Sequence, residues 1–142
     1  MKSNRKIALV TGGAKRIGQA ICKLLHASDI DLMIHYRHSA DEAKTLQENL
    51  DKIRKGSANI IQADLVNTSI LPNLVEETIN TYGRLDILIN NASSYYPTEI
   101  GKMNEKNWTD LIGSNLKAPL FLSQLAANEL IKTKGCIINI TD

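Results

Sequence analysis

The chain has 142 residues, of which 43% are hydrophobic, and its formal net charge at pH 7 is +2. This length allows one domain at most, with enough apolar residues for a core. This net charge is too small to argue for nucleic acid as a partner, since the cations are scattered, and no run approaches the roughly 18 apolar residues of a membrane span. The basic start of the chain lacks the apolar segment of a signal peptide.

The two cysteines indicate the compartment. Cys22 falls within a predicted helix and Cys136 within a predicted apolar strand, so we expect both to be buried. Two distant, buried cysteines suit a reducing environment better than a disulfide framework. The sequence therefore predicts a cytoplasmic protein, with no membrane partner and no metal ion.

The first predicted unit is a strand, a glycine turn and a helix. Residues 7–10 (IALV) form a short apolar run, as in a strand that is buried on both faces. Gly12 and Gly13 turn the chain, and apolar residues at helical spacing predict a helix from about Lys15. The positive end and free N–H groups of such a helix form an anion site. The glycines alternatively make only a tight turn, but Lys15 and Arg16 beside them favour a bound pyrophosphate.

The segment TGGAKRIG resembles the cofactor turn T-G-x-x-x-G-x-G of the short-chain dehydrogenase/reductases. It departs from that pattern at Arg16, which replaces the middle glycine, and this replacement is typical of the pteridine reductase branch. The resemblance implies that Gly12, Lys15, Arg16 and Ile17 bind the cofactor and that Arg16 also contacts the substrate.

Strands and helices alternate along the rest of the chain. Strands are predicted at 31–36, 58–63, 85–89 and 136–140, and helices at 39–56 (opened by a capping box at 39–42), 70–82 and 104–132, with a polar loop at 90–103. This order predicts an α/β fold, a Rossmann-like doubly wound parallel sheet with helices on both faces, truncated after the fifth strand. Ligands bind such sheets beyond the carboxyl ends of the strands. Residues 1–142 would thus form the NADP-binding, N-terminal part of a longer reductase domain.

The end of the second strand bears on the choice of cofactor. An acid there usually holds a ribose 2′-hydroxyl, whereas cations hold a 2′-phosphate. The chain offers Tyr36, Arg37, His38 and Ser39 and no carboxylate, which favours NADPH over NADH. A solvated basic loop is the alternative. The segment is similar to the H-Y-H-R-S of pteridine reductases, which implies that these four residues contact the cofactor.

Two further segments follow strands three and four. Asp64 either caps the next helix or, as the family's D-L pair implies, contacts the adenine together with Leu65. The segment NNAS at 90–93 either makes a simple turn or, as the resemblance implies, lines the nicotinamide ribose with Asn91, Ala92 and Ser93. Pteridine reductases carry the same N-N-A-S.

The polar loop after strand four carries two adjacent tyrosines, Tyr95 and Tyr96, in the segment SYYPT. They either anchor the loop or offer a ring on which a flat heteroaromatic substrate stacks. The segment is similar to the S-F-Y-P-T of pteridine reductases, which implies that Tyr95, with Ser93 and Arg16, contacts a pterin.

The long helix places a polar residue on a predicted buried stripe. We expect Asn115 to lie there with Leu111, Ile112, Leu116 and Phe121. Pro119 has no N–H for the carbonyl of residue 115, so a kink is expected. The pair is explained either by that kink alone or, through the resemblance, by the Asn that holds a water in the family's proton relay.

The chain ends at Asp142, where pteridine reductases place a catalytic aspartate. The family's Tyr-x-x-x-Lys pair is absent from these residues. The resemblance therefore implies the N-terminal part of an NADPH-dependent reductase of a pterin or dihydrofolate-type small molecule. It also implies a homo-oligomer, a tetramer in the full-length family, and predicts that these residues alone are inactive. A reductase of keto or sugar substrates and a non-catalytic nucleotide-binding module are the alternatives. Strand 136–140 is expected to be an apolar edge that promotes association.

Overall fold

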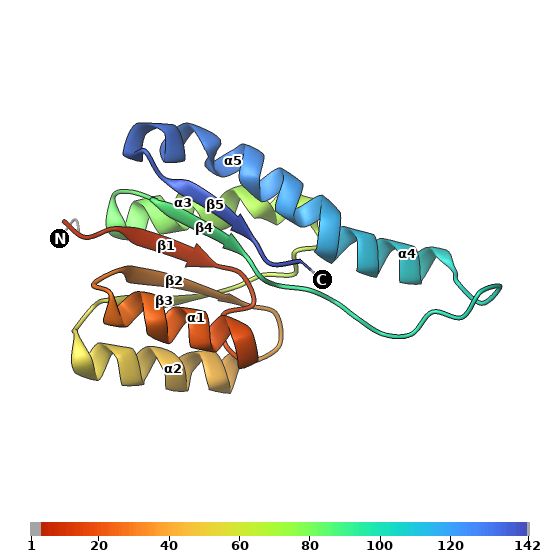
Figure 1. Ribbon diagram of the computed structural model, residues 1–142, viewed down its shortest axis with the longest axis horizontal. Helices are drawn as coiled ribbons and strands as arrows, with labels where there is room; N and C mark the ends of the chain where they lie inside the picture. The colour runs from red at the N-terminus through yellow and green to blue at the C-terminus, as the bar shows by residue number, and fades with distance from the viewer. Residues whose placement is uncertain (1–3, 142) are drawn as a thin grey trace.

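Five short apolar runs form one parallel sheet in the computed structural model, which describes residues 4–141 (Figure 1). The strand order is β3-β2-β1-β4-β5, so the predicted doubly wound, Rossmann-like sheet is confirmed. The strands are β1 (Ile7–Val10), β2 (Asp31–Tyr36), β3 (Ala58–Gln62), β4 (Ile87–Asn90) and β5 (Cys136–Asn139). The helices are α1 (Arg16–Ala27), α2 (Ala40–Ile53), α3 (Leu71–Tyr82), α4 (Glu105–Ile112) and α5 (Ala118–Thr133), with a 3-10 turn, η1 (Thr68–Ile70), and a π-helical segment, η2 (Gly113–Lys117).

Helices cover the two faces of the sheet in pairs (Figure 1): α1 and α2 lie on one face, and α3 and α5 on the other. Successive residues of a strand point to opposite faces, and β1 divides its side chains accordingly. Val10 packs with Ile34 in the core under α1 and α2, whereas Leu9 packs with Leu74 and Leu122 under α3 and α5. Both cores depend on the central strand, which is fully buried.

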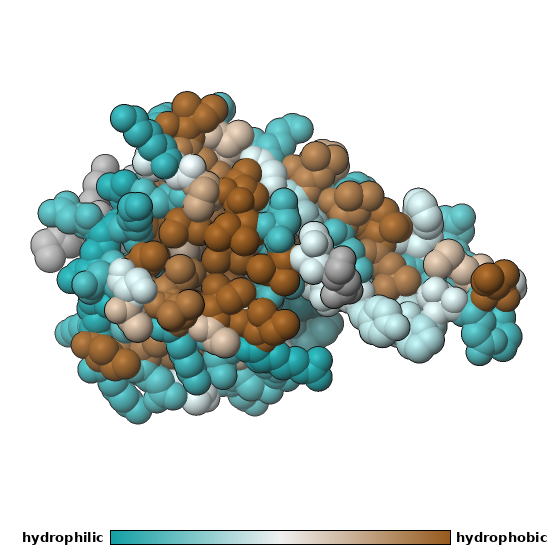
Figure 2. Space-filling view, in the orientation of Figure 1, coloured by the Kyte–Doolittle hydropathy of each residue, from teal (hydrophilic) through white to brown (hydrophobic). Residues whose placement is uncertain are grey.

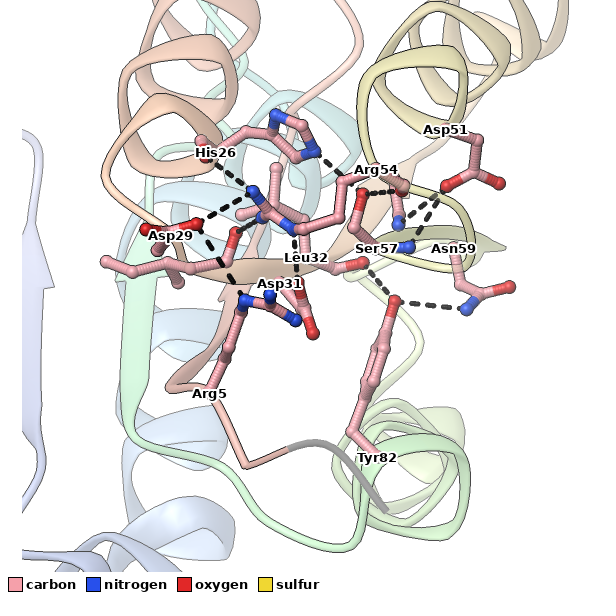
Figure 3. A network of polar contacts seen from close by, with 12 residues as sticks. Arg5, His26, Asp29, Asp31, Leu32, Asp51, Arg54, Ser57, Asn59 and Tyr82 are labelled. Carbon is pink, nitrogen blue, oxygen red and sulfur yellow. Dashed lines mark hydrogen bonds and ion pairs between the residues drawn. The ribbon is translucent and has the colours of Figure 1, made fainter. Parts of the chain in front are cut away.

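A network of polar contacts surrounds the starts of strands β2 and β3 (Figure 3). Arg54, just after α2, donates to the Asp31 carboxylate (Nε–Oδ1 3.0 Å) and to the carbonyl oxygens of His26 (3.0 Å) and Ile30 (2.9 Å). The His26 ring contacts the Ser57 hydroxyl at 2.7 Å. Because Arg54 and Asp31 are mostly buried, these contacts fix the end of α1 against the starts of two strands.

The prediction of one continuous helix from 104 to 132 is wrong, because the α-helix is interrupted near its middle. A capping box of Asn104 and Asn107 starts α4, but five π-helical residues then separate α4 from α5. A π-turn adds a residue to the helical ring and rotates all later side chains relative to the earlier ones. Leu116 and Phe121, expected to be buried, are therefore 62% and 39% exposed. The buried face of α5 is instead formed by Ala118, Leu122, Ala126 and Leu130.

The β5 edge of the sheet exposes apolar side chains. Among residues 4–141, strand β5 pairs only with β4, and all four of its residues are exposed, as predicted for an apolar edge. Cys136 is exposed with them, so its predicted burial is wrong. Figure 2 shows apolar side chains gathered across the middle of this face, where Figure 1 places β4 and β5. The exposed large apolar residues of η2, the first half of α5, β5 and the residue just after β5 are Leu116, Leu120, Phe121, Leu125, Ile137, Ile138 and Ile140.

Smaller differences concern element ends. Helix α2 ends at Ile53 rather than at Gly56, which lies in the following turn with a φ of +73°, and β4 begins at Ile87 rather than Leu85. Within residues 4–141, no helix combines the length and the apolar character needed to cross a bilayer.

Candidate functional site

A cleft of about 930 Å³ opens at the carboxyl ends of the strands, beside the β1–β4 boundary where the strand order reverses. The loops after β1, β2, β3 and β4 line it, together with η2 and the start of α5. The structure thus brings together nearly all of the residues predicted for the cofactor and proton relay: Gly12, Lys15, Arg16, Ile17, Tyr36, Arg37, His38, Ser39, Asp64, Leu65, Asn91, Ala92, Ser93 and Asn115.

The glycine turn after β1 depends on two close backbone approaches. Gly12 has a φ of +61°, and a Cβ added there would lie 2.9 Å from the Cα of Ala92. A Cβ on Gly18 would lie only 2.1 Å from the Gly12 carbonyl oxygen. Arg16 has a φ of +49°, which explains why the related motif has glycine at that position. The chain accepts this left-handed residue and gains a cationic side chain on the cleft.

The N-terminus of α1 carries no side-chain cap, and its first residues line the cleft. The free N–H groups of the first turn and the helix dipole suit a phosphate group, so these residues fit a dinucleotide pyrophosphate. Lys15 lies beside them and contacts the Glu42 carboxylate (Nζ–Oε1 2.7 Å). This hydrogen bond lowers the pKa of the Glu42 carboxyl.

The predicted capping box at residues 39–42 is wrong. The Ser39 side chain makes no capping hydrogen bond, and Glu42 contacts Lys15 rather than the backbone of residue 39. A cation from the neighbouring helix offers the carboxylate a charge-assisted partner, which a backbone N–H does not. The N-terminus of α2 consequently also opens on the cleft without a side-chain cap.

The asparagine segment after β4 is tied to the glycine turn. Thr11 Oγ1 accepts the backbone N–H groups of Asn91 and Ala92, each at 3.0 Å. The Asn91 amide in return donates to the carbonyl oxygens of Thr11 (3.0 Å) and Gly12 (3.1 Å). These bonds join the ends of β1 and β4, so Asn91 does more than form a local turn.

Sequence reasoning missed His35, the buried support of the glycine turn. Its Nδ1 accepts the Gly12 N–H (3.1 Å), and its Nε2 contacts the Ala63 carbonyl oxygen (3.0 Å). This pairing requires a neutral ring with the proton on Nε2, and burial lowers the pKa of His35. The available signal was a histidine directly after the apolar run 32–34 of the strand DLMIHY.

Arg37, at the end of β2, contacts two carboxylates. Its Nη2 lies 3.0 Å from Asp64 and its Nη1 3.3 Å from Asp110, while its Nε is buried and has no hydrogen-bond partner among the described residues. Asp64 also accepts the Val66 N–H (3.1 Å), whereas Asn67 caps the following turn. The helix-cap interpretation of Asp64 is therefore wrong.

Asn115 lies on η2, is exposed rather than buried, and binds the loop after β4. Its Oδ1 accepts the Ser94 N–H and its Nδ2 donates to the Ser94 carbonyl oxygen, both at 2.9 Å. Tyr95 follows immediately but is 84% exposed and does not line the cleft. Asp142, the predicted catalytic aspartate, lies outside the described residues.

Acidic, histidine and cysteine side chains do not assemble into a metal site anywhere in the described part of the chain. The cleft is lined by backbone, amide and hydroxyl groups, by the cations Lys15, Arg16 and Arg37, and by Asp64, His35 and His38. Such a set suits phosphate and ribose groups.

Comparison with known proteins gives a consistent result. The family model described as "short chain dehydrogenase" matches residues 6–141. The chain is 34% identical to pteridine reductase 1 of Leishmania tarentolae over 174 aligned positions, covering 96% of this chain and 60% of that protein. It is 29% identical to the 3-oxoacyl-(acyl-carrier-protein) reductases FabG of Staphylococcus epidermidis and Staphylococcus aureus over 137 positions, covering 96% of this chain. The chain thus spans little more than half the length of these curated relatives, 55–60%.

Proposed function

Because the chain belongs to the short-chain dehydrogenase family, we propose that it is the cofactor-binding part of an NADPH-dependent oxidoreductase. The observation that carries the proposal is the cleft itself. Two uncapped helix N-termini and three cations surround it, and no carboxylate occurs among residues 36–39 at the end of β2. The α1 turn suits the pyrophosphate, and Arg37 with His38 suits the 2′-phosphate.

Titration of the chain with NADPH and with NADH tests the cofactor. We expect NADPH to bind more tightly, because a charge-assisted contact to the 2′-phosphate contributes about 1.5–3 kcal/mol. Arg37→Asp should remove this preference and leave NADH binding nearly unchanged. Lys55→Asp makes the same charge change at an exposed residue just beyond α2, outside the cleft, and is the matched control. Equal affinities of the parent chain for the two cofactors would refute the proposal.

For the substrate, we propose a pterin or a dihydrofolate-type molecule, reduced by hydride from NADPH in the longer protein. Support comes from the similarity to a pteridine reductase, from Arg16 at the cleft and from the ring of Tyr95 next to the segment that Asn115 fixes. The 142 residues contain no Tyr-x-x-x-Lys pair, so we expect no turnover from them alone. Asp142 stays a predicted helper of the missing tyrosine.

A keto substrate is the second candidate, and the similarity to the 3-oxoacyl reductases favours it. Oxidation of NADPH by the longer polypeptide, measured separately with dihydrobiopterin, dihydrofolate and a 3-oxoacyl thioester, distinguishes the two. Turnover of the thioester alone would replace the pterin proposal by the keto one. Cofactor binding without turnover of any carbonyl or pterin compound would favour a nucleotide-binding module.

We further propose a cytoplasmic homo-oligomer. Cys22 and Cys136 are both free thiols, which suits a reducing compartment. The apolar residues on β5 and α5 provide a surface for a protein contact. Sedimentation of the longer polypeptide tests the assembly, and a monomer at micromolar concentration would refute it.

A further inference from the structure

The Arg37 side chain, predicted to hold the 2′-phosphate, lies between two carboxylates from different parts of the chain. Asp64 follows β3, and Asp110 lies on α4. Both contacts use the outer amino groups of the guanidinium, whereas its Nε is buried. The donors that remain open to the cleft are therefore the ones that already face carboxylates, and the three charges sum to −1.

The two carboxylates differ in their other contacts. Asp64 also accepts the Val66 N–H, so part of its function is to fix the loop after β3. Among residues 4–141, Arg37 is the only recorded partner of the Asp110 carboxylate. The Asp110 backbone carbonyl oxygen accepts the Ser114 hydroxyl at 2.8 Å. The Asp110 carboxylate approaches Arg37 from α4, an element separate from the loops after β2 and β3.

We propose that Asp110 is a specificity-determining residue that competes with the 2′-phosphate of NADPH for Arg37 and thereby reduces the discrimination between NADPH and NADH; this rests on the proposed NADPH-binding function. A phosphate that binds the Nη atoms of Arg37 must displace the Asp110 carboxylate or accept a like charge close by. NADH carries a hydroxyl at the same position and experiences no such repulsion. Asp110 therefore lowers the affinity for NADPH and leaves the affinity for NADH unchanged.

Removal of this charge tests the proposal. Dissociation constants for NADPH and NADH are measured by fluorescence titration with the parent chain, Asp110→Asn and Asp110→Glu. We expect Asp110→Asn to bind NADPH about three- to fivefold more tightly, as for the loss of one partly exposed ionic contact, with NADH unchanged within about twofold. Asp110→Glu retains the charge and should keep the parent ratio. Glu105→Gln, an exposed change on the same helix, is the matched control.

A double-variant test separates competition from a structural role. In an Arg37→Gln background, Asp110→Asn should increase the NADPH affinity by less than it does in the parent chain, because the competition for the shared cation is gone. If Asp110 only anchors α4, Asp110→Asn lowers the midpoint of thermal unfolding and changes both affinities equally or not at all, which overturns the inference. If Asp110→Asn does not fold, the ratio of the NADPH and NADH dissociation constants is measured with Asp110→Ser instead. A parent chain that binds neither cofactor would instead refute the proposed function, whatever Asp110 does.

Discussion

Substitution of His35 tests most directly how the glycine turn after β1 is held in place. Its ring bridges the Gly12 N–H and the Ala63 carbonyl oxygen at 3.1 and 3.0 Å, in a strand position that is 1% exposed. His35→Phe keeps a planar ring but removes both nitrogen atoms. Each of the two backbone groups that lose their partner costs about 1–3 kcal/mol, so we expect the free energy of unfolding to fall by roughly 2–6 kcal/mol.

The same residue predicts a pH dependence with a definite sign. Burial lowers the pKa of His35 below its ordinary value of 6.5, and burial also lowers the pKa of His26. Below pH 6.5 the unfolded chain therefore binds more protons than the folded one, and the free energy of unfolding decreases as the pH falls. The decrease begins near pH 6.5 and ends below the pKa values of the folded state.

Urea unfolding at a series of pH values from about 8 to 5 measures both effects. His35→Asn is the informative variant, because its amide oxygen replaces the acceptor for Gly12 but does not titrate. We expect it to be more stable than His35→Phe and to lack the part of the acid-induced loss that His35 contributes. His38→Gln, which removes an exposed imidazole, is the matched control. Parent-like stability of His35→Phe, or an unchanged pH profile in His35→Asn, would refute the reasoning.

Three further outcomes are expected. Arg54→Gln, which removes the contact between Arg54 and the buried Asp31 carboxylate, should cost about 3–5 kcal/mol in urea unfolding, whereas Lys52→Gln, an exposed change in the last turn of α2, should cost less than about 0.5 kcal/mol. Tyr95→Ala in the longer enzyme should weaken pterin binding by about 1–3 kcal/mol with NADPH affinity unchanged, and unaltered pterin binding would reduce the tyrosine to a loop anchor. The isolated 142-residue chain should associate through β5, and Ile138→Lys should lower the sedimenting mass; a monomeric parent chain contradicts this.

The sheet was predictable because its signals are local. Each inner strand is a run of four to six residues, most of them apolar. Gly12 and Gly18, where a side chain would clash with the backbone, indicate the glycine turn. Since parallel strands present their carboxyl ends at one edge, the residues that follow β1 to β4 had to gather there. The cleft thus followed from chain order alone, without knowledge of any single contact.

Two of the failed predictions depend on contacts between segments that are distant in sequence, and a third depends on a local change of helical period. Glu42 at the start of α2 was expected to cap its own helix, but Lys15, just before α1, binds it instead. Burial of Cys136 required a neighbour on the outer side of β5, and the described residues provide none. The π-helical segment η2 arises within an uninterrupted apolar pattern, so a constant period of 3.6 residues placed Leu116 on the wrong face.

The contacts of the cations show why motif residues alone overstate affinity. Lys15 and Arg37 were predicted as phosphate ligands because of their type and position, and both line the cleft. Each also contacts a carboxylate, at 2.7 Å for Lys15 with Glu42 and at 3.0 Å for Arg37 with Asp64. A phosphate that binds them gains only the difference between its own contacts and those that it replaces. The acids beside the motif therefore set the strength and selectivity of nucleotide binding as much as the basic residues within it.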